Sequence, residues 1–295
     1  MDRLLRGLVR GPEGVARVVA ALTTSACREA AERHAASAAA GIALARASSA
    51  ALLLATLTKG DERVTVQLLG DGPLRGVTAV ASDAGEVRGF VTRAQVATAP
   101  VVGRARLAPL IGAGTLNVIR DLGLRERYQG ATALVSGEID EDVEHYLTSS
   151  EQVVSALACD AVVDARGQLV AAGGVLVQCL PGGDVEIVER ARARLRSGVV
   201  FDALAASAAG PVELALQAVG IEPEILDLRP VRFHCPCTRE RVAAALALCG
   251  EDELADMLAR DGGAQVTCNF CNQSYDVTAE ELERLLAEAR SLPRA

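Results

Sequence analysis

Two short cysteine pairs near the C-terminus restrict the fold of this chain more than any other sequence feature. Cys235 and Cys237 form a CxC pair. Cys268 and Cys271 form a CxxC pair, and 30 residues (238 to 267) separate the two pairs. Two such pairs can close a tetrahedral Zn²⁺ site with four thiolates. We therefore predict that the four cysteines bind one zinc ion per chain and that the intervening residues fold back to bring them together.

A site with four cysteine ligands has no open coordination position, so the predicted centre is structural and not a Lewis-acid catalyst. Thiolates are also the oxidisable form of cysteine. The spacing alone therefore leaves two interpretations: a zinc staple for a small domain, or a redox switch. A thioredoxin-like interpretation of the CxxC pair is weaker, because no strand-to-helix redox turn surrounds it. A deaminase signature fails because Thr238, Arg239 and Glu240 stand where a second cysteine is required.

The remaining candidate side chains carry no recognisable chemistry. We predict that the other four cysteines are buried small residues, that His34 and His145 lie on helix surfaces, and that His234 is not a fifth ligand. No nucleophile elbow or complete phosphate loop is present, so no catalytic residue is assigned and no enzyme activity is expected. An enzyme within residues 1 to 180 stays an alternative without a motif. The four cysteines in question are Cys27, Cys159, Cys179 and Cys249.

Charge and composition restrict the partners and the location. The chain has 38 acidic and 30 basic side chains, a net charge of −8, and only 2% aromatic residues. A phosphate backbone would be repelled and stacking platforms are scarce, so no nucleic-acid partner is expected. No secretory signal is recognisable, which predicts a cytoplasmic protein. Residues 35 to 57 are apolar, but Arg46 interrupts them, so we expect a buried helix and no membrane partner.

The pattern of elements predicts an α+β first domain spanning residues 1–182. Residues 15 to 57 have helical spacing broken at Gly41, which predicts two helices. Alternation then predicts an antiparallel meander, two further strands, a helix that begins with three carboxylates, and a hairpin. These elements are expected over Val64–Leu68, Gly76–Ala81, Val87–Thr92, Thr115–Arg120, Gly130–Ser136, Ile139–Ser149 and Val162–Val177.

Two smaller parts follow the first domain. Residues 183–230 have arginines on an Ala/Leu background with glycine and proline breaks, which predicts a helical linker. Residues 231–295 form the predicted zinc domain, with helices after Thr238 and Glu251, two strands around the CxxC pair, and a capping box from Thr278 to Glu281. A unit this small needs a staple, and zinc can supply it.

Several stretches along nearly the whole chain form a recognisable set: QLLGDGP (67–73), VRGF (87–90), ERYQG (126–130), SEQ (150–152), AAGG (171–174), FHCPCTRER (233–241) and CNFC (268–271) followed by Tyr275. With these stretches the chain resembles one family, the thirty-three-kilodalton heat-shock proteins, which are redox-regulated holdase chaperones. The CxC and CxxC pairs in this order are the most specific part of the resemblance.

The resemblance implies a function. The four cysteines would bind zinc when reduced and form Cys235–Cys237 and Cys268–Cys271 disulfides when oxidised. Oxidation would release zinc, unfold the last domain and the linker, and expose apolar surface that binds unfolding client proteins without ATP. The resemblance also implies an active homodimer, and no motif identifies the client-contact residues. The alternative is a zinc-ribbon adaptor that binds a folded protein or nucleic acid in its reduced form.

Overall fold

The computed structural model describes the whole chain except residues 59–61, 99, 122–127, 207–208 and 292–295. Glu126 and Arg127, which belong to one of the resembling stretches, therefore lie outside the described residues. The described chain divides into two compact units, Met1–His234 and Cys235–Ala295. In chain order the elements are β1 (Arg3–Arg10), β2 (Val15–Leu22), α1 (Thr24–Arg33), α2 (Ala38–Ala55), β3 (Arg63–Gly70), β4 (Gly76–Ser82), β5 (Glu86–Val91), α3 (Ala108–Ile111), β6 (Gly114–Asp121), β7 (Tyr128–Ala133), α4 (Ile139–Ser149), β8 (Ser155–Val163), β9 (Leu169–Cys179), α5 (Val185–Arg196), α6 (Val199–Ala205), α7 (Pro211–Val219), β10 (Glu224–Pro230), β11 (Arg232–Phe233), α8 (Arg239–Ala247), α9 (Glu251–Asp261), β12 (Gly263–Thr267), β13 (Ser274–Thr278) and α10 (Ala279–Ser291).

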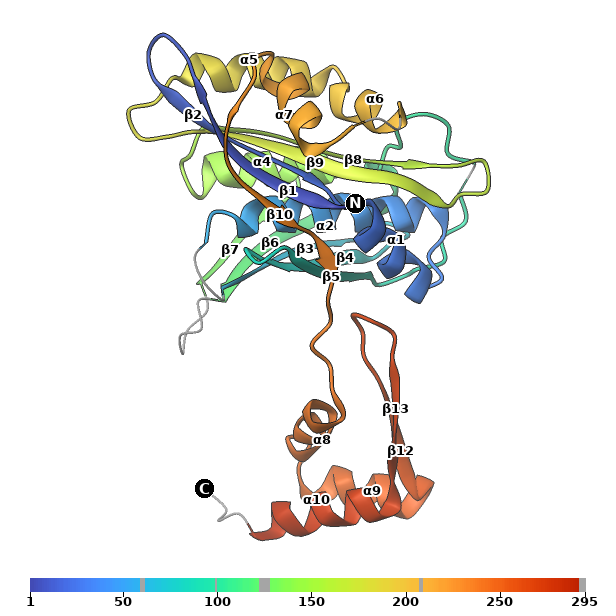
Figure 1. The fold of residues 1–295 in the computed structure, drawn as a ribbon. Coiled ribbons are helices and arrows are strands. Elements are labelled where there is room, and N and C mark those ends of the chain that lie inside the picture. Colours follow the sequence, from blue (N-terminus) through green and yellow to red (C-terminus); the bar gives the residue numbers. More distant parts are fainter. Residues whose placement is uncertain (59–61, 99, 122–127, 207–208, 292–295) are drawn as a thin grey trace. The chain divides into compact units, whose positions relative to one another are not determined.

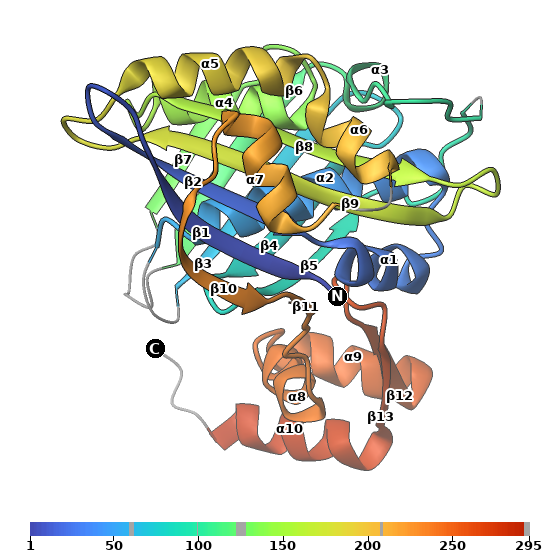
Figure 2. The same ribbon diagram turned by 45° about the horizontal axis from the view of Figure 1, so that its top comes forward.

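Helix α2 forms the centre of the first unit, between two β-sheets (Figures 1 and 2). One sheet has the strand order β10-β1-β2-β9-β8 and the other β11-β5-β4-β3-β6-β7. Residues 39 to 55 of the helix are all buried, and most are Ala, Ser or Gly, so both sheets can approach its axis closely. Length and composition would let α2 cross a membrane, but 94% of it is buried inside the protein. The prediction of a buried helix is confirmed.

The second sheet contains the predicted meander. Strands β3, β4 and β5 pair antiparallel in sequence order, and β6 and β7 extend the sheet on the other side of β3. Alternate residues of these strands, such as Val64 and Val66, join the core around α2. The predicted helix over Ile139–Ser149 is α4, and the predicted hairpin is β8 and β9. These local predictions are confirmed, and with them the α+β class.

The prediction for the N-terminus was wrong. Val15–Leu22 is strand β2, not helix, and pairs with β1 on one side and β9 on the other. The two helices are α1 and α2, and the break between them lies at residues 34 to 37, not at Gly41, which is inside α2. Strand β2 is central in its sheet, and residues 18 to 21 are all buried because one face packs into each of the two apolar cores. Burial on both faces explains why an Ala/Val-rich sequence adopts extended backbone here.

Residues 183–230 belong to the first compact unit in this structure. Helices α5, α6 and α7 cover the face of the first sheet that points away from α2, and they share a second apolar core with β1, β2, β8 and β9. The segment is not helical throughout, because β10 pairs antiparallel with β1. The predicted domain boundaries, at residues 182/183 and 230/231, stay predictions.

A buried charge network joins α2 to the start of α4. Arg46 is 1% exposed, and its guanidinium donates to Glu138 Oε2 at 2.9 Å and to Asp140 Oδ1. Arg104 donates to Asp140 Oδ2 at 2.9 Å and to Asp160 Oδ1 at 2.8 Å. Three buried or nearly buried carboxylates therefore surround two guanidinium groups. The second oxygen of Asp160 is buried without a hydrogen-bond partner among the described residues.

Asp160 should make the stability of the first unit depend on pH. Burial raises its pKa to about 6 from an ordinary value of 3.8, although Arg46 and Arg104 oppose the shift. The folded state therefore keeps a proton that the unfolded state has lost between about pH 4 and pH 6, so this group lowers the free energy of unfolding as pH rises through that window. We measure the free energy of unfolding in urea at several pH values across this range. Plotted against pH, it should fall less steeply for Asp160→Asn than for the unchanged protein. Identical slopes would contradict the prediction.

Two glycine-to-alanine changes should act in opposite directions. A Cβ at Gly41 would lie 3.7 Å from Ala31 Cβ, an ordinary contact, so Gly41→Ala should raise the free energy of unfolding by roughly 0.5–1 kcal/mol through helix propensity. A Cβ at Gly70 would lie 2.0 Å from the main-chain oxygen of Ile111. Gly70→Ala should therefore lower the free energy of unfolding by about 1–3 kcal/mol. Urea unfolding followed by circular dichroism measures both, and a destabilising Gly41→Ala would be the contrary result.

Candidate metal centre

The second unit is built from local signals that the sequence displays. Thr238 Oγ1 caps α8 by accepting from Arg241 N at 3.3 Å. Thr278 and Glu281 form the predicted capping box of α10, with Thr278 N donating to Glu281 Oε2 at 2.9 Å and Glu281 N donating to Thr278 Oγ1 at 3.3 Å. Gly262, at a φ of 60°, ends α9 and leads into the β12–β13 hairpin. The predicted helices and strands of this unit are confirmed.

The hairpin and the start of α8 bring four sulfur atoms together. The Sγ atoms of the two cysteine pairs all lie within 4.8 Å of one another. Cys235 Sγ is 3.7 Å from Cys268 Sγ, and Cys237 Sγ is 3.1 Å from Cys271 Sγ. A tetrahedron with Zn–S bonds of about 2.3 Å has sulfur–sulfur edges of about 3.8 Å. The four thiols are therefore positioned to bind one metal ion.

The turn between β12 and β13 holds the CxxC pair in place. Cys268 N donates to Gln273 O at 2.9 Å, and Asn272 N donates to Cys268 O at 2.8 Å. Asn272 adopts a φ of 57°, a left-handed conformation that asparagine tolerates better than most residues. Two main-chain hydrogen bonds and one left-handed residue thus fold the turn that presents both sulfurs on one side.

Tyr275 contacts the centre from β13. Its hydroxyl lies 3.2 Å from Cys237 Sγ and 3.2 Å from Cys237 O. The hydrogen bond to Cys237 raises the pKa of Tyr275 to about 12, so the hydroxyl keeps its proton and remains a donor. The sequence placed Tyr275 among the resembling residues but did not predict this contact, because nothing in the spacing places residue 275 beside residue 237.

The Cys271 thiol favours its protonated form when no cation is bound. Burial raises the pKa of the Cys271 thiol well above its ordinary value, and the neighbouring Cys237 adds to the shift. Cys271 is only 4% exposed. A dication at the centre of the four sulfurs would reverse this preference, because coordination deprotonates thiols outright. The chemistry of the donor set therefore fits a soft divalent metal such as zinc.

Three arginines close to the cysteine pairs in the sequence have other hydrogen-bond partners. Arg239 is held by Glu281 at 2.9 Å and donates to Asp276 O at 2.7 Å, and Arg241 donates to Pro236 O at 3.1 Å. Arg232 belongs to the first unit, where it pairs with Glu86 at 2.7 Å. Carboxylates and main-chain oxygens thus engage these three guanidinium groups.

The other cysteines and the histidines do not belong to the four-thiol group. Cys27 and Cys159 are buried as predicted, but Cys179 is half-buried and Cys249 is exposed, which corrects the prediction for both. Cys249 follows the end of α8, whose apolar face is made by other residues. The four-thiol group does not include a histidine. His145 is exposed on α4, as expected; the remaining two, His34 and His234, directly follow α1 and β11.

Fold and site together define a two-unit α+β protein whose smaller unit carries four thiols positioned to bind a metal ion. The family model described as "Hsp33 protein" matches residues 2–278. The 33 kDa chaperonin of Bacillus subtilis is 39% identical over 287 residues, covering 97% of this chain and 98% of that protein. The chain therefore belongs to the Hsp33 family.

Further relatives agree in sequence and in structure. The 33 kDa chaperonin of a Synechococcus species is 40% identical over 301 residues, covering 99% of this chain and 92% of that protein. The crystal structure of the 33 kDa chaperonin, a heat shock protein 33 homolog, from Thermotoga maritima superposes with a TM-score of 0.86 at 31% identity. It covers 97% of this chain and 98% of that one. The likeness thus includes both units.

Replacing Tyr275 by phenylalanine should weaken metal retention. Tyr275→Phe removes the hydroxyl that donates to Cys237 Sγ and leaves the ring in place. Losing such an outer hydrogen bond typically costs 10- to 100-fold in metal affinity, so we expect about a tenfold loss, measured by competition with a chromogenic chelator. Tyr128→Phe, a tyrosine in β7 of the first unit, is the matched control. Equal metal retention by both variants would contradict the prediction.

Proposed function

We propose that this protein is a redox-regulated, ATP-independent holdase that binds unfolding proteins and prevents their aggregation. The single observation that carries the proposal is the cluster of four thiols within 4.8 Å of one another in a small unit, in a chain of the Hsp33 family. Cys235, Cys237, Cys268 and Cys271 bind one Zn²⁺ in the reduced form. The activity is binding rather than turnover, in agreement with relatives that are named chaperonins.

The oxidation step balances with peroxide as the oxidant. Each of two thiolates attacks one peroxide oxygen and releases hydroxide, and the sulfenic acid that forms is attacked by the second thiolate of its pair. Cys235 thereby joins Cys237, and Cys268 joins Cys271. Four thiolates lose four electrons to two H₂O₂ molecules, which take up four protons and leave as four waters, and the zinc ion leaves as Zn²⁺. These two disulfides are the ones that the resemblance to the Hsp33 family implies.

Loss of the metal then leads to unfolding that exposes apolar surface. The second unit loses the ion that holds it together and unfolds. Residues 183–230 follow, and the helices α5 to α7 leave the face of the first sheet. Val175, Val177 and Leu5 are fully buried under these helices and become accessible. An apolar sheet face of this kind binds exposed apolar segments of an unfolding client.

The remaining parts of the proposal concern assembly and location. The active form is a homodimer in the cytoplasm, where reducing conditions keep the four cysteines reduced and bound to zinc until an oxidant appears. Its partners are unfolding proteins; neither nucleic acid nor a membrane takes part. The net charge of −8 agrees with the absence of a nucleic-acid partner.

The proposal is tested by two assays on one sample. The reduced, zinc-loaded protein is treated with peroxide at a heat-shock temperature, and zinc release is measured with a chromogenic chelator while light scattering follows a chemically denatured client. Zinc release and suppression of scattering should appear together and should both reverse after reduction and zinc addition. Cys249→Ser should behave as the unchanged protein. Oxidation without zinc release, or zinc release without suppression, would overturn the proposal.

A further inference from the structure

Strand β7 forms an open edge of the second sheet (Figure 1). Among the described residues it pairs only with β6, over six residue pairs without a bulge. Leu134 N, directly after the strand, donates to Gly114 O at 2.9 Å. Hydrogen-bonded and non-hydrogen-bonded pairs alternate in an antiparallel ladder, so the even-numbered residues of β7 bond to β6. The N–H and C=O groups of Gln129, Ala131 and Ala133 therefore point to the free side of the strand.

The sequence of β7 does not protect this edge. Edge strands are usually guarded by charged side chains, proline, a bulge or a covering element, because unpaired main-chain groups can pair with another extended chain. Residues 128–137, YQGATALVSG, contain neither a charged side chain nor proline. The three residues with free main-chain groups are exposed, and two of them are alanines. An incoming strand therefore meets no charge and little steric hindrance along β7.

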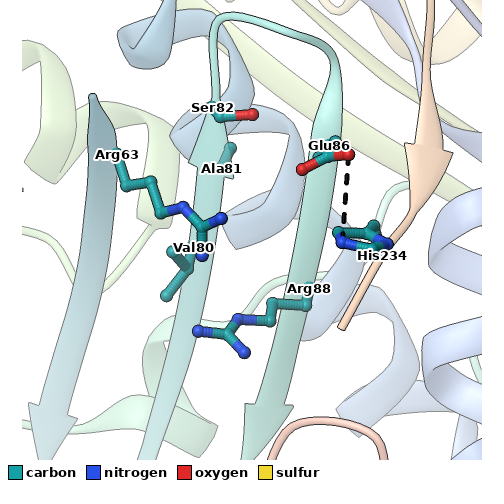
Figure 3. A pocket seen from close by; sticks show the side chains of 7 residues that line it. All are labelled: Arg63, Val80, Ala81, Ser82, Glu86, Arg88 and His234. Atoms are coloured by element: carbon teal, nitrogen blue, oxygen red, sulfur yellow. Dashed lines mark ion pairs between the residues drawn. The ribbon is translucent and has the colours of Figure 1, made fainter. Parts of the chain in front are cut away.

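The other sheet edges of the first unit carry such protection. Strand β10 has three charged residues, and a bulge interrupts its pairing with β1. Residues 155 to 161 of β8 are buried, and α4, α5 and α6 pack against this strand. The edge at β11 is two residues long and charged: Figure 3 shows His234 beside Glu86 of β5, at 3.9 Å, and Arg232 pairs with the same carboxylate at 2.7 Å. Within the described part of the first unit, β7 alone is left open.

We propose that the free edge of β7 binds an extended, uncharged segment of an unfolding protein by adding it to the sheet as a further strand. This inference rests on the proposed holdase function, because it names a contact for the same clients. Unfolding exposes extended backbone, whose N–H and C=O groups can pair with those of Gln129, Ala131 and Ala133. Pairing of main-chain groups does not depend on a particular client sequence. Tyr128 and Val135, which are 52% and 59% exposed, offer apolar contacts at the two ends of the edge.

A second copy of β7 is a poorer partner for this edge. Two six-residue strands of mostly small side chains bury little apolar area, whereas a stable interface buries roughly 800 Å² on each partner. An unfolded client is not limited to the edge. In the oxidised form it can also contact the apolar sheet face under α5 to α7, and a chain that contacts both surfaces is held more tightly than by either one.

The edge is open in the reduced, folded protein, so its binding can be measured without oxidation. The test uses the full-length, reduced protein and an uncharged, fluorescently labelled peptide of alternating valine and threonine. Fluorescence anisotropy should show saturable binding, and hydrogen exchange of the segment that contains β7 should slow when the peptide is bound. The same peptide with every amide nitrogen methylated cannot donate to the edge and should bind about fivefold more weakly or less tightly still.

Substitutions at Ala131 separate main-chain pairing from other effects. Ala131→Pro removes an N–H that points to the free side, a position at which an edge strand tolerates proline. Ala131→Lys places a charge on the edge. Both should weaken peptide binding about fivefold or more, and Ala131→Thr, which keeps the N–H, should bind the peptide more tightly than Ala131→Pro. Val102→Lys is the matched control for the charge, because Val102 is 90% exposed in a loop of the first unit, and it should leave binding within about twofold.

Client assays connect the edge to the holdase function. Compared at equal zinc release, oxidised Ala131→Pro and Ala131→Lys should suppress client aggregation less than the unchanged protein does. If the unchanged protein did not suppress aggregation at all, the proposed function would fail, and the peptide titrations would still decide whether β7 binds an extended chain. The edge proposal is overturned if the methylated peptide binds as tightly as the unmethylated one, or if Ala131→Lys binds like Val102→Lys. It is also overturned if Ala131→Lys changes only the self-association of the protein, since the occupant would then be a second copy.

Discussion

Removal of the metal from the reduced protein is expected to unfold residues 235–295 while residues 1–234 keep their fold. Binding of zinc by four thiolates contributes on the order of 10–16 kcal/mol, which exceeds the stability that a unit of this size can hold in its apolar core. The first unit has two extensive cores of its own and contains none of the four cysteines. The core of the second unit contains only six buried residues among those described: Val242, Leu246, Leu254, Val277, Leu282 and Leu286.

Hydrogen exchange measured by mass spectrometry separates the two units. After treatment with a zinc chelator under reducing conditions, peptides from α9, β12, β13 and α10 should exchange within the dead time, and peptides from α2 should stay protected. Cys268→Ser should reproduce this result without chelator. Cys249→Ser is the matched control, because Cys249 lies in the same unit but outside the four-thiol group. Persistent protection of α9 and α10 after complete zinc removal would contradict the prediction.

The second unit could be predicted from the sequence because its signals are local. Thr238 caps the helix that begins at the next residue, and the capping box joins Thr278 to Glu281, three positions further on. The spacing of each cysteine pair already limits how far apart its two sulfurs can lie. The contact of Tyr275 with Cys237 could not be predicted, because the two residues are 38 positions apart in the sequence and meet only in the folded unit.

The N-terminal strands could not be predicted because their partners are distant. Residues 16–22 of β2 are extended because residues 173–179 of β9 pair with them, across more than 150 residues of sequence. Ala and Val at these positions are compatible with a helix until that pairing is known. Similarly, the helical spacing of residues 183–230 indicated α5 to α7 but not the sheet that they cover.

The role of Arg46 could not be predicted either, because the carboxylates that pair with its charge are distant in the sequence. In the sequence it only interrupts an apolar stretch. In the structure its partners Glu138 and Asp140 lie 92 and 94 residues further along the chain, and they hold its guanidinium in the middle of the core. Nearby carboxylates outweigh desolvation and raise the pKa of Arg46 above its ordinary value, so the charge is permanent. A permanent buried charge makes this position decisive for the first unit.

Replacing Arg46 by methionine should lower the free energy of unfolding of the first unit by about 3–5 kcal/mol. Methionine fills much of the same volume, but it leaves Glu138 and Asp140 buried without the guanidinium that both contact, and an orphaned buried charge is strongly destabilising. Arg190→Met is the matched control: Arg190 is exposed on α5, and its pair with Glu186 at 3.6 Å should contribute no more than about 0.5 kcal/mol. Urea unfolding followed by circular dichroism compares the two.

A double variant tests the cause of the loss. In Arg46→Met with Glu138→Gln, one of the two orphaned carboxylates becomes a neutral amide whose oxygen can still accept from Leu107 N, a hydrogen bond of 2.8 Å in the present structure. The double variant should therefore be more stable than Arg46→Met alone, whereas Glu138→Gln in the unchanged background should be destabilising because it weakens a buried ion pair. If Arg46→Met cost no more than Arg190→Met, or if the double variant were less stable than either single one, the charge network would not be what fastens α4 to the central helix.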